Sequence, residues 1–201
     1  MSSPLLTLQA RIRFDGGACR ELEIDRWLAE ADDVDHRLLD RARGPVIDIG
    51  CGPGRHVEAL TMRSTEALGI DLSPDFVAFA QARDRRVLLR SVFDPLPREA
   101  AWGSALLLDG SIGIGGDPAA LLRRVGGLLA SGGRALIETA SPDDTSDRVT
   151  MSLESHDGPD SWFDWSTLAA SDVGPLTRST AFELADQWQD GDRWFAQLDR
   201  R

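Results

Sequence analysis

A glycine-rich turn is the stretch of this chain whose residue types and spacing point most clearly to chemistry. Asp48 lies in a short apolar run, Cys51 follows it, and glycines occupy alternate positions around them: Gly50, Gly52 and Gly54. A glycine turn between a strand and a helix lets backbone N–H groups approach a nucleotide-like ligand. The dinucleotide fingerprint G-x-G-x-x-G would need a glycine where Arg55 stands, and Asp48 would repel a pyrophosphate. The turn therefore favours a ligand that carries positive charge.

Acidic residues close three further apolar segments, as expected of strand ends that bind a nucleoside. Asp71 follows the first glycine by about 20 residues, where a carboxylate accepts hydrogen bonds from ribose hydroxyls. Phe93 and Asp94 end the next segment, where a ring and a carboxylate are placed to flank an adenine. Leu108 and Asp109 end the one after, which would border the reacting group. Turn chemistry explains each alone, but four such features at successive strand ends predict a nucleoside cofactor.

Strand and helix patterns alternate from Pro45 onward and give these residues their framework. Ser73 and Asp117 are placed as N-caps of two helices. The closing segments 182–189 and 193–199 predict an antiparallel hairpin. The remaining strands are expected at 46–50, 67–71, 87–94, 104–110 and 134–140. The pattern predicts an α/β fold: a Rossmann-like, mostly parallel seven-stranded sheet with helices on both faces and a terminal antiparallel hairpin.

Two regions lie outside this core. Residues 5–28 alternate apolar and polar around a DGG turn, which predicts a β-hairpin, and a short helix follows. We expect this N-terminal cap to span 1–44 and a cofactor-binding domain to span 45–201. Within that domain, the polar, turn-rich residues 142–180 form a variable region on the substrate side, with a second hairpin around Asp157-Gly158.

Composition narrows the classes of partner. The 201 residues suit one domain, and 42% hydrophobic with 27% charged residues is the balance of an ordinary globule. No apolar run approaches the roughly 20 residues that cross a bilayer, and no signal-peptide pattern opens the sequence, so we expect a cytoplasmic protein without a membrane partner. The net charge of −11 argues against a nucleic-acid partner. Cys19 and Cys51 lack ligand-spaced partners, which argues against a disulfide framework or a cysteine metal site.

Four successive motifs resemble those of the class I S-adenosylmethionine-dependent methyltransferases: VIDIGCGPG, LGIDLSP, SVFDPLP and LLLDGSIG. The terminal hairpin resembles that family's extra strand pair, so the resemblance extends over residues 45–198. The stretch 109–138 is also similar to small actinobacterial members of the family. The resemblance implies S-adenosyl-L-methionine as the cofactor and methyl transfer as the activity.

The resemblance also implies a role for each motif residue. The glycine turn, with Cys51 in it, would hold the methionine part of the cofactor, and Asp48 would support its amino group. The carbonyl of Leu108 would accept a hydrogen bond from the ammonium. The residues implied on the adenosine side are Asp71 for the ribose, Leu72 for the adenine ring, and Phe93 with Asp94 for the adenine edge.

The motif after the fourth strand departs from the patterns that fix a substrate class. It is DGSI, whereas methyltransferases that act on the amino groups of nucleobases or glutamine have Asn/Asp-Pro-Pro-aromatic there. The chain has no Lys for the catalytic tetrad of ribose-methylating enzymes. The Asp–His metal pattern of catechol-type enzymes does not occur either. We expect a small-molecule acceptor. Two other interpretations stay open: a nicotinamide-dependent oxidoreductase, which Arg55 and the Phe93-Asp94 pair disfavour, and a non-catalytic protein that binds S-adenosylmethionine.

Several residues near the expected site have a structural and a functional interpretation. Asp109 either caps the turn that follows it or acts as a general base on the acceptor. His56 is expected on the solvated face of its helix, and His156 in a lid over the substrate. We expect the N-terminal hairpin and residues 142–180 to roof the acceptor site together. Packing in the core or in hairpins is expected for Trp162, Trp165, Trp188 and Trp194.

Overall fold

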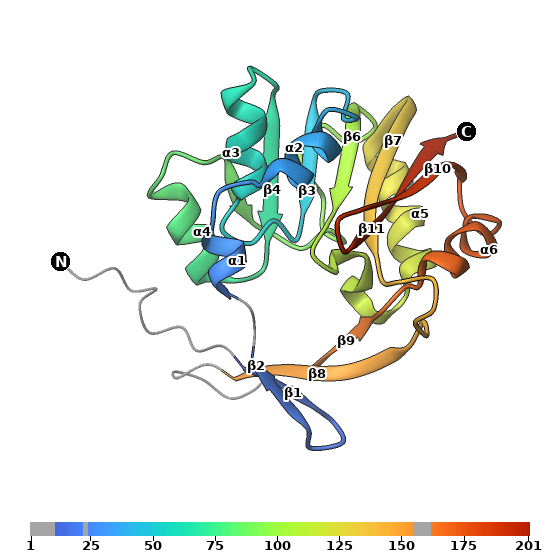
Figure 1. Cartoon of the computed structure of the whole chain (residues 1–201). Helices are drawn as coiled ribbons and strands as arrows, with labels where there is room; N and C mark the ends of the chain where they lie inside the picture. Colours follow the sequence, from blue (N-terminus) through green and yellow to red (C-terminus); the bar gives the residue numbers. More distant parts are fainter. Residues whose placement is uncertain (1–10, 22–23, 155–161) are drawn as a thin grey trace.

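A seven-stranded sheet forms the centre of the molecule (Figure 1). The computed structural model describes residues 11–21, 24–154 and 162–201. The strands lie in the order β10-β11-β7-β6-β3-β4-β5, and β11 is antiparallel to both of its neighbours. All other pairings are parallel. The strands are β3 (Val46–Ile49), β4 (Ala67–Asp71), β5 (Val87–Leu89), β6 (Trp102–Leu107), β7 (Leu129–Thr139), β10 (Phe182–Asp190) and β11 (Arg193–Arg200).

Helices cover both faces of this sheet, because its central strands are apolar on both sides. In β3, Val46 packs on one face with the helices α2 (Asp33–Leu39), α3 (Arg55–Met62) and α4 (Pro74–Gln81). Ile47 and Ile49 point to the other face, towards α5 (Pro118–Leu128), α6 (Val173–Thr177) and the 3₁₀ helix η2 (Ser111–Gly116). The same alternation sends the side chain of Asp48 to the α3 face. The predicted fold class is confirmed.

A second, four-stranded sheet joins the two regions that were expected outside the core. Its order is β2-β1-β8-β9, with β1 (Arg11–Phe14), β2 (Cys19–Glu21), β8 (Arg148–Glu154) and β9 (Trp162–Ser166). The two predicted hairpins are present as antiparallel pairs, and β1 pairs with β8 to unite them. The Asp157-Gly158 turn lies outside the described residues. Figure 1 shows this sheet beyond the C-terminal ends of β3, β4 and β6.

Local signals placed several element boundaries correctly. The side chain of Ser73 accepts the Phe76 N–H at the start of α4, and that of Asp117 accepts the Ala120 N–H at the start of α5. A short helix, α1 (Ile24–Leu28), stands where the last part of the first hairpin was expected. The third core strand was expected to reach Asp94, but β5 ends at Leu89.

The last hydrogen bond between β5 and β4 runs from the Arg90 N–H to the Asp71 carbonyl, and the chain leaves the sheet after it. A turn follows, closed by a bond from the Asp94 N–H to the Ser91 carbonyl at 3.2 Å. Phe93 and Asp94 therefore lie in a turn past the strand rather than at its end. Within the described residues, no helix has the length and apolar character needed to cross a membrane.

Candidate functional site

The glycine turn connects β3 to α3 with all three glycines in the left-handed region. Their φ angles are 68° for Gly50, 53° for Gly52 and 82° for Gly54, which residues with a Cβ seldom adopt. The N–H groups of Gly50 and Cys51 donate to the Ile70 carbonyl and fix the turn against β4. A Cβ on Gly50 would lie 3.0 Å from the Ile114 side chain, whereas a Cβ on Gly52 would meet open space. The turn thus presents bare backbone at Gly52.

Asp71 holds this turn from the end of β4. Its Oδ2 accepts the Gly52 N–H at 2.8 Å and its Oδ1 accepts the Ser73 N–H at 2.8 Å. Burial raises the pKa of Asp71, against the lowering effect of these N–H groups. Since a carboxylate oxygen accepts two hydrogen bonds, each oxygen keeps one free lone pair for a ligand hydroxyl.

Two large apolar side chains stay uncovered next to Asp71. Leu72 is 66% exposed and Phe93 is 50% exposed. The Phe93 ring packs near η2, since a Cβ on Gly115 would lie 3.1 Å from it. Arg124 from α5 holds the turn that carries Phe93, with bonds to the carbonyls of Val92 and Asp94. Asp94 itself is exposed. This rim offers apolar contact to a flat ligand.

The end of β6 carries Leu108 and Asp109. Leu108 is buried, and its carbonyl accepts the Ser111 N–H at 3.0 Å, which leaves one lone pair for a further donor. Asp109 has a φ of 51°, a conformation that aspartate tolerates better than most residues. Its N–H donates to the Glu138 carboxylate at 2.9 Å, and Glu138 comes from β7.

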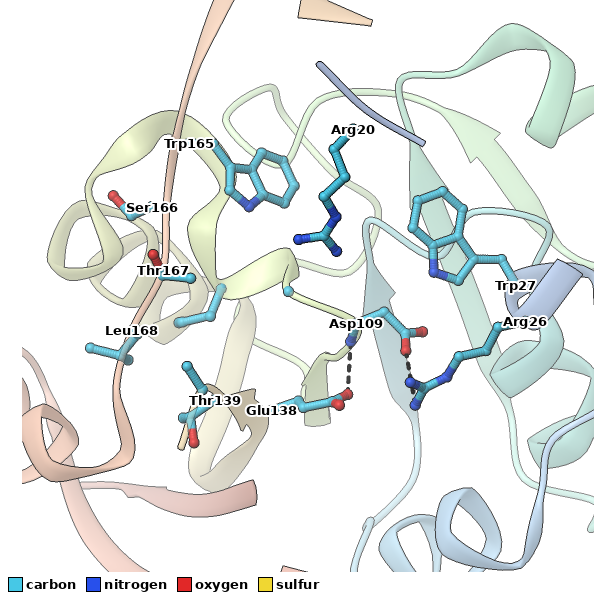
Figure 2. A pocket seen from close by; sticks show the side chains of 13 residues that line it. Arg20, Arg26, Trp27, Asp109, Glu138, Thr139, Trp165, Ser166, Thr167 and Leu168 are labelled. Carbon is cyan, nitrogen blue, oxygen red and sulfur yellow. Dashed lines mark hydrogen bonds and ion pairs between the residues drawn. The ribbon is translucent and has the colours of Figure 1, made fainter. Parts of the chain in front are cut away.

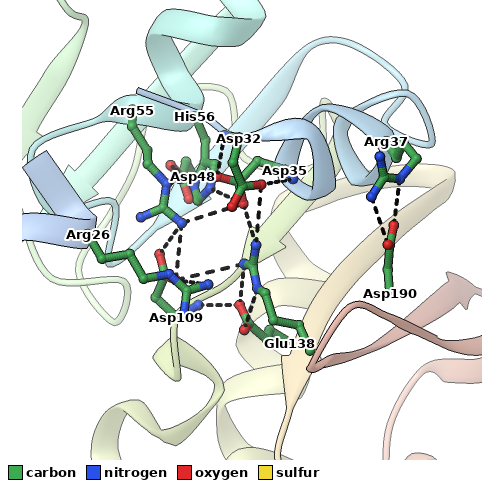
Figure 3. Close-up of polar contacts among 11 residues, drawn as sticks. Arg26, Asp32, Asp35, Arg37, Asp48, Arg55, His56, Asp109, Glu138 and Asp190 are labelled. Carbon is green, nitrogen blue, oxygen red and sulfur yellow. Dashed lines mark hydrogen bonds and ion pairs between the residues drawn. The ribbon is translucent and has the colours of Figure 1, made fainter. Parts of the chain in front are cut away.

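The Asp109 carboxylate binds guanidinium groups (Figure 3). Arg55 Nη2 lies 2.9 Å from one of its oxygens, and the Nη2 atoms of Arg26 and Arg193 lie 3.7 and 3.8 Å away. Among the residues that the structure describes, no backbone N–H bonds to this carboxylate. Of the two interpretations given for Asp109, turn capping through its carboxylate is therefore not seen among the described residues, and the carboxylate belongs to an ion cluster.

Arg55, noted in the sequence only as the missing third glycine, is a centre of that cluster. It is 4% exposed, and its Nε donates to Asp35 of α2 at 3.0 Å. Arg193 of β11 donates to Asp35 at 2.7 Å and forms a two-bonded pair with Glu138. These bonds connect α2, α3, β6, β7 and β11 around the base of the site (Figure 3).

His56 is also part of this cluster, so the solvated position expected for it is wrong. It is 3% exposed, with Nε2 3.3 Å from Asp35 and Nδ1 3.6 Å from Asp48. Burial disfavours the charged imidazolium, but Asp35 and Asp48 outweigh burial and raise the pKa of His56 to about 9. Burial alone would raise the pKa of Asp35, whereas His56 and Arg55 hold it well below its ordinary value.

One sequence signal does point to this cluster. Arg55 and His56 occupy the first turn of α3, where the helix dipole disfavours cations. Such a conflict between residue type and position indicates acidic partners nearby. The partners themselves have no local signal, because Arg55 and Asp35 are 20 positions apart and Arg193 and Asp35 are 158 apart.

A pocket of about 280 Å³ opens beside Asp109, between the two sheets (Figure 2). Trp165 lines it and also packs edge-to-face on Phe163 in β9, and Trp188 stacks on Phe195 at 5.6 Å, so both have the packing role expected from the sequence. His156 lies outside the described residues. The lining residues are Arg20, Arg26, Trp27, Asp109, Gly110, Ile112, Glu138, Thr139, Ala140, Trp165, Ser166, Thr167 and Leu168.

The pocket draws on both regions outside the core. Arg20 comes from β2, Arg26 and Trp27 from α1, and residues 165–168 from β9 and the chain after it. Cys19 and Cys51 are free, and within the described ranges no group of three acidic, histidine or cysteine side chains is placed to hold a metal ion.

Comparisons with known proteins agree with this geometry. Residues 46–133 match the family model described as a methyltransferase domain. A S-adenosylmethionine-dependent methyltransferase from Bacteroides fragilis, in complex with S-adenosyl-L-homocysteine, superposes with a TM-score of 0.80 at 20% identity over 95% of this chain and 87% of that one. No curated protein matches the chain in sequence.

Two further solved structures have the same fold. The Burkholderia thailandensis 1,6-didemethyltoxoflavin-N1-methyltransferase gives a TM-score of 0.65 at 19% identity, over 88% of this chain and 81% of that one. A sugar N-methyltransferase from Streptoalloteichus gives 0.61 at 22% identity, over 87% and 88%. Residues 46–133 therefore match a methyltransferase domain model, and the chain has the fold of these S-adenosylmethionine-dependent methyltransferases, as its motifs predict.

Proposed function

We propose that this chain transfers a methyl group from S-adenosyl-L-methionine to a small-molecule acceptor. One observation carries the proposal: the bare backbone at Gly52 and the exposed side chains around Asp71 lie on the same strand-end edge as the pocket beside Asp109. A cofactor surface and an acceptor pocket thus adjoin at the end of β6. The Bacteroides fragilis methyltransferase of the same fold is in complex with the demethylated form of this cofactor.

The residues present fit the cofactor from one end to the other. Leu72, Phe93 and Asp94 would hold the adenine, and the free lone pairs of Asp71 would accept the ribose hydroxyls. The methionine part would follow the turn from Gly50 to Gly54, with the Leu108 carbonyl as an acceptor for the ammonium.

Two buried residues support the cofactor from behind the turn. Asp48 is 2% exposed, and its Oδ2 has no hydrogen-bond partner among the described residues and lies 3.6 Å from His56. Its charge, shared with His56, would support the ammonium. Burial raises the pKa of the Cys51 thiol well above its ordinary value, which makes Cys51 a neutral packing residue of the turn.

The cofactor supplies an activated methyl group, and the task of the chain is to position the acceptor and exclude water. Asp109 faces the pocket with its carboxylate fixed by Arg55. There it would accept a hydrogen bond from the N–H or O–H of the acceptor and orient the nucleophile, the one catalytic role that we assign.

The pocket also favours a small acceptor. Its volume of about 280 Å³ is near the lower end of small-molecule sites. The Burkholderia enzyme of the same fold has 1,6-didemethyltoxoflavin bound. We place residues 1–44 as a cap, 45–201 as the cofactor-binding domain and 142–180 on the substrate side. The cytoplasm as location and the absence of a nucleic-acid partner stay predictions.

Calorimetry tests the cofactor assignment. We expect S-adenosylhomocysteine to bind and NAD not to bind. Leu72→Ser should lower the affinity for S-adenosylhomocysteine by about tenfold, because the substitution removes about 1.4 kcal/mol of apolar contact. Met62→Ser is the matched control, because Met62 is 83% exposed at the far end of α3. Equal affinity in wild type and Leu72→Ser would contradict the site.

A transfer assay separates an enzyme from a non-catalytic binder. Purified protein and methyl-tritiated S-adenosylmethionine are incubated with a fractionated cell extract, and small-molecule and macromolecular fractions are counted separately. Label in the small-molecule fraction supports the proposal. Cofactor binding without any methyl transfer would contradict the proposal and would indicate a non-catalytic protein that binds S-adenosylmethionine.

A further inference from the structure

The acceptor pocket contains a cation that the described residues leave unpaired. Arg20 of β2 is exposed, and within the described ranges no hydrogen bond or ion pair engages its guanidinium. Figure 2 shows the Arg20 side chain pointing into the pocket, above Asp109. An arginine fork that faces a pocket without a partner is suited to a carboxylate or phosphate oxygen pair from a ligand.

The two acidic residues of the pocket do not cancel this charge. Asp109 is already bound by Arg55 at 2.9 Å, and Glu138 by two bonds from Arg193. Arg26, 39% exposed at its side chain, adds a further guanidinium at the rim, 3.7 Å from Asp109. Each carboxylate therefore has its own guanidinium, and Arg20 is available to a ligand.

Aromatic rings form the sides of the same pocket. Trp165 and Trp27 lie on opposite sides of Arg20 in Figure 2. Each makes an edge-to-face contact with a phenylalanine, Trp165 with Phe163 at 6.1 Å and Trp27 with Phe76 at 5.9 Å between ring centroids. Indole faces favour a flat, conjugated ligand over a flexible or strongly hydrated one.

Resting on the proposed function, we infer that the methyl acceptor is a planar, conjugated acid of one or two rings. Its ring system lies against Trp165 and Trp27, and its anionic group binds Arg20. The pocket volume of about 280 Å³ sets the upper size. A neutral sugar offers neither the flat face nor the fixed negative charge.

Calorimetry on the complex with S-adenosylhomocysteine tests this inference with matched probes. The probes are indole-3-carboxylate, 2-naphthoate and naphthyl phosphate, together with the uncharged amides of the two carboxylates. We expect each carboxylate to bind at least about tenfold more tightly than its amide, the size of one charge-assisted pair. The phosphate arm shows which anionic group is preferred.

Two variants divide the ring contact from the charge contact. Arg20→Met should bring acid and amide to equal affinity, whereas Arg11→Met on the neighbouring strand β1 should keep the preference for the acid. Trp165→Leu should weaken acid and amide by the same factor. Equal binding of acid and amide by the wild type, a preference that survives Arg20→Met, or no binding by any acid overturns the inference. Binding of S-adenosylhomocysteine, measured separately, decides the proposed function whatever the acids do.

Discussion

At the scale of single residues, the charge of His56 is set by where it is buried. Its two ring nitrogens face Asp35 and Asp48, which are themselves 1% and 2% exposed. Neither carboxylate has bulk water to solvate it, so the imidazolium is favoured as a counter-ion for Asp48 and as a third cation beside Asp35. His56 thus connects the acid behind the glycine turn to the cluster that holds Asp109.

This burial predicts a loss of stability at alkaline pH. The pKa of His56 is about 9 in the fold, above its ordinary 6.5. The stabilisation is therefore complete below pH 6.5 and is lost as pH rises through 9. Urea unfolding at pH 6 and at pH 9.5 should show a decrease of up to about 3 kcal/mol in the free energy of unfolding.

The variant His56→Gln supplies the control. Glutamine keeps hydrogen-bonding capacity but does not titrate, so the variant should be less stable near neutrality and nearly independent of pH over the same window. An equally steep pH dependence in the variant would assign the effect to another group.

A second prediction at this scale concerns the role of Asp109 in turnover, and it can be tested once an acceptor is identified. Asp109→Asn keeps one acceptor oxygen but loses the charge that faces Arg55 and the substrate. If Asp109 orients or deprotonates the acceptor, kcat should fall by about 10²-fold or more while S-adenosylhomocysteine affinity holds. The melting temperature should fall as well, because buried Arg55 loses a charged partner. Normal turnover would leave Asp109 as a structural member of the ion cluster.

At the scale of elements, Asp35 adds a charged anchor between α2 and the sheet. Asp35 from this short helix receives Arg55 of α3, Arg193 of β11 and His56. Leu38 and Leu39 of the same helix are buried against the sheet, and the buried acid adds ion pairs to that apolar contact.

Removing that charge should be costly. Asp35→Asn would leave two buried guanidinium groups and an imidazolium short of a partner, which predicts a loss of about 3 kcal/mol or more in the free energy of unfolding. Asp33→Asn on the same helix is the matched control, because Asp33 is exposed and should change stability little. Similar urea midpoints for the two variants would contradict the assigned role of Asp35.

The sequence predicts those elements that are defined by interactions between residues close together in the chain. The strand β4 agrees with its expected bounds, because apolar patterns and turn residues act within a few residues. Residues 24–28 were misassigned because so short a segment does not separate helical from alternating patterns. The partners of Arg55 and the lining of the pocket come together only in the tertiary fold, so no local pattern predicts them.

At the scale of the whole molecule, the pocket exists because the small sheet closes over the large one. The strand β9 packs on η2 at Gly113, where an added Cβ would lie 2.0 Å from the Ser166 carbonyl and 2.6 Å from Trp165 Nε1. On its other side, η2 is fixed by Ile112 in the core and by Ile114 against the glycine turn. A side chain at position 113 would therefore displace β9, an edge strand, rather than η2.

Gly113→Ala should accordingly damage acceptor binding and spare the cofactor. Displacement of β9 moves Trp165 and Ser166, which line the pocket, whereas the adenosine side of the site is formed by β4 and the chain after β5. We expect acceptor affinity to fall by about tenfold or more while S-adenosylhomocysteine affinity, measured by calorimetry, is unchanged. Gly126→Ala in α5 is the matched glycine control, since its Cβ would lie 3.6 Å from the nearest atom and should leave both affinities intact. A parallel loss of cofactor affinity in Gly113→Ala would mean that η2 moves instead, and that the two binding sites are not mechanically separate.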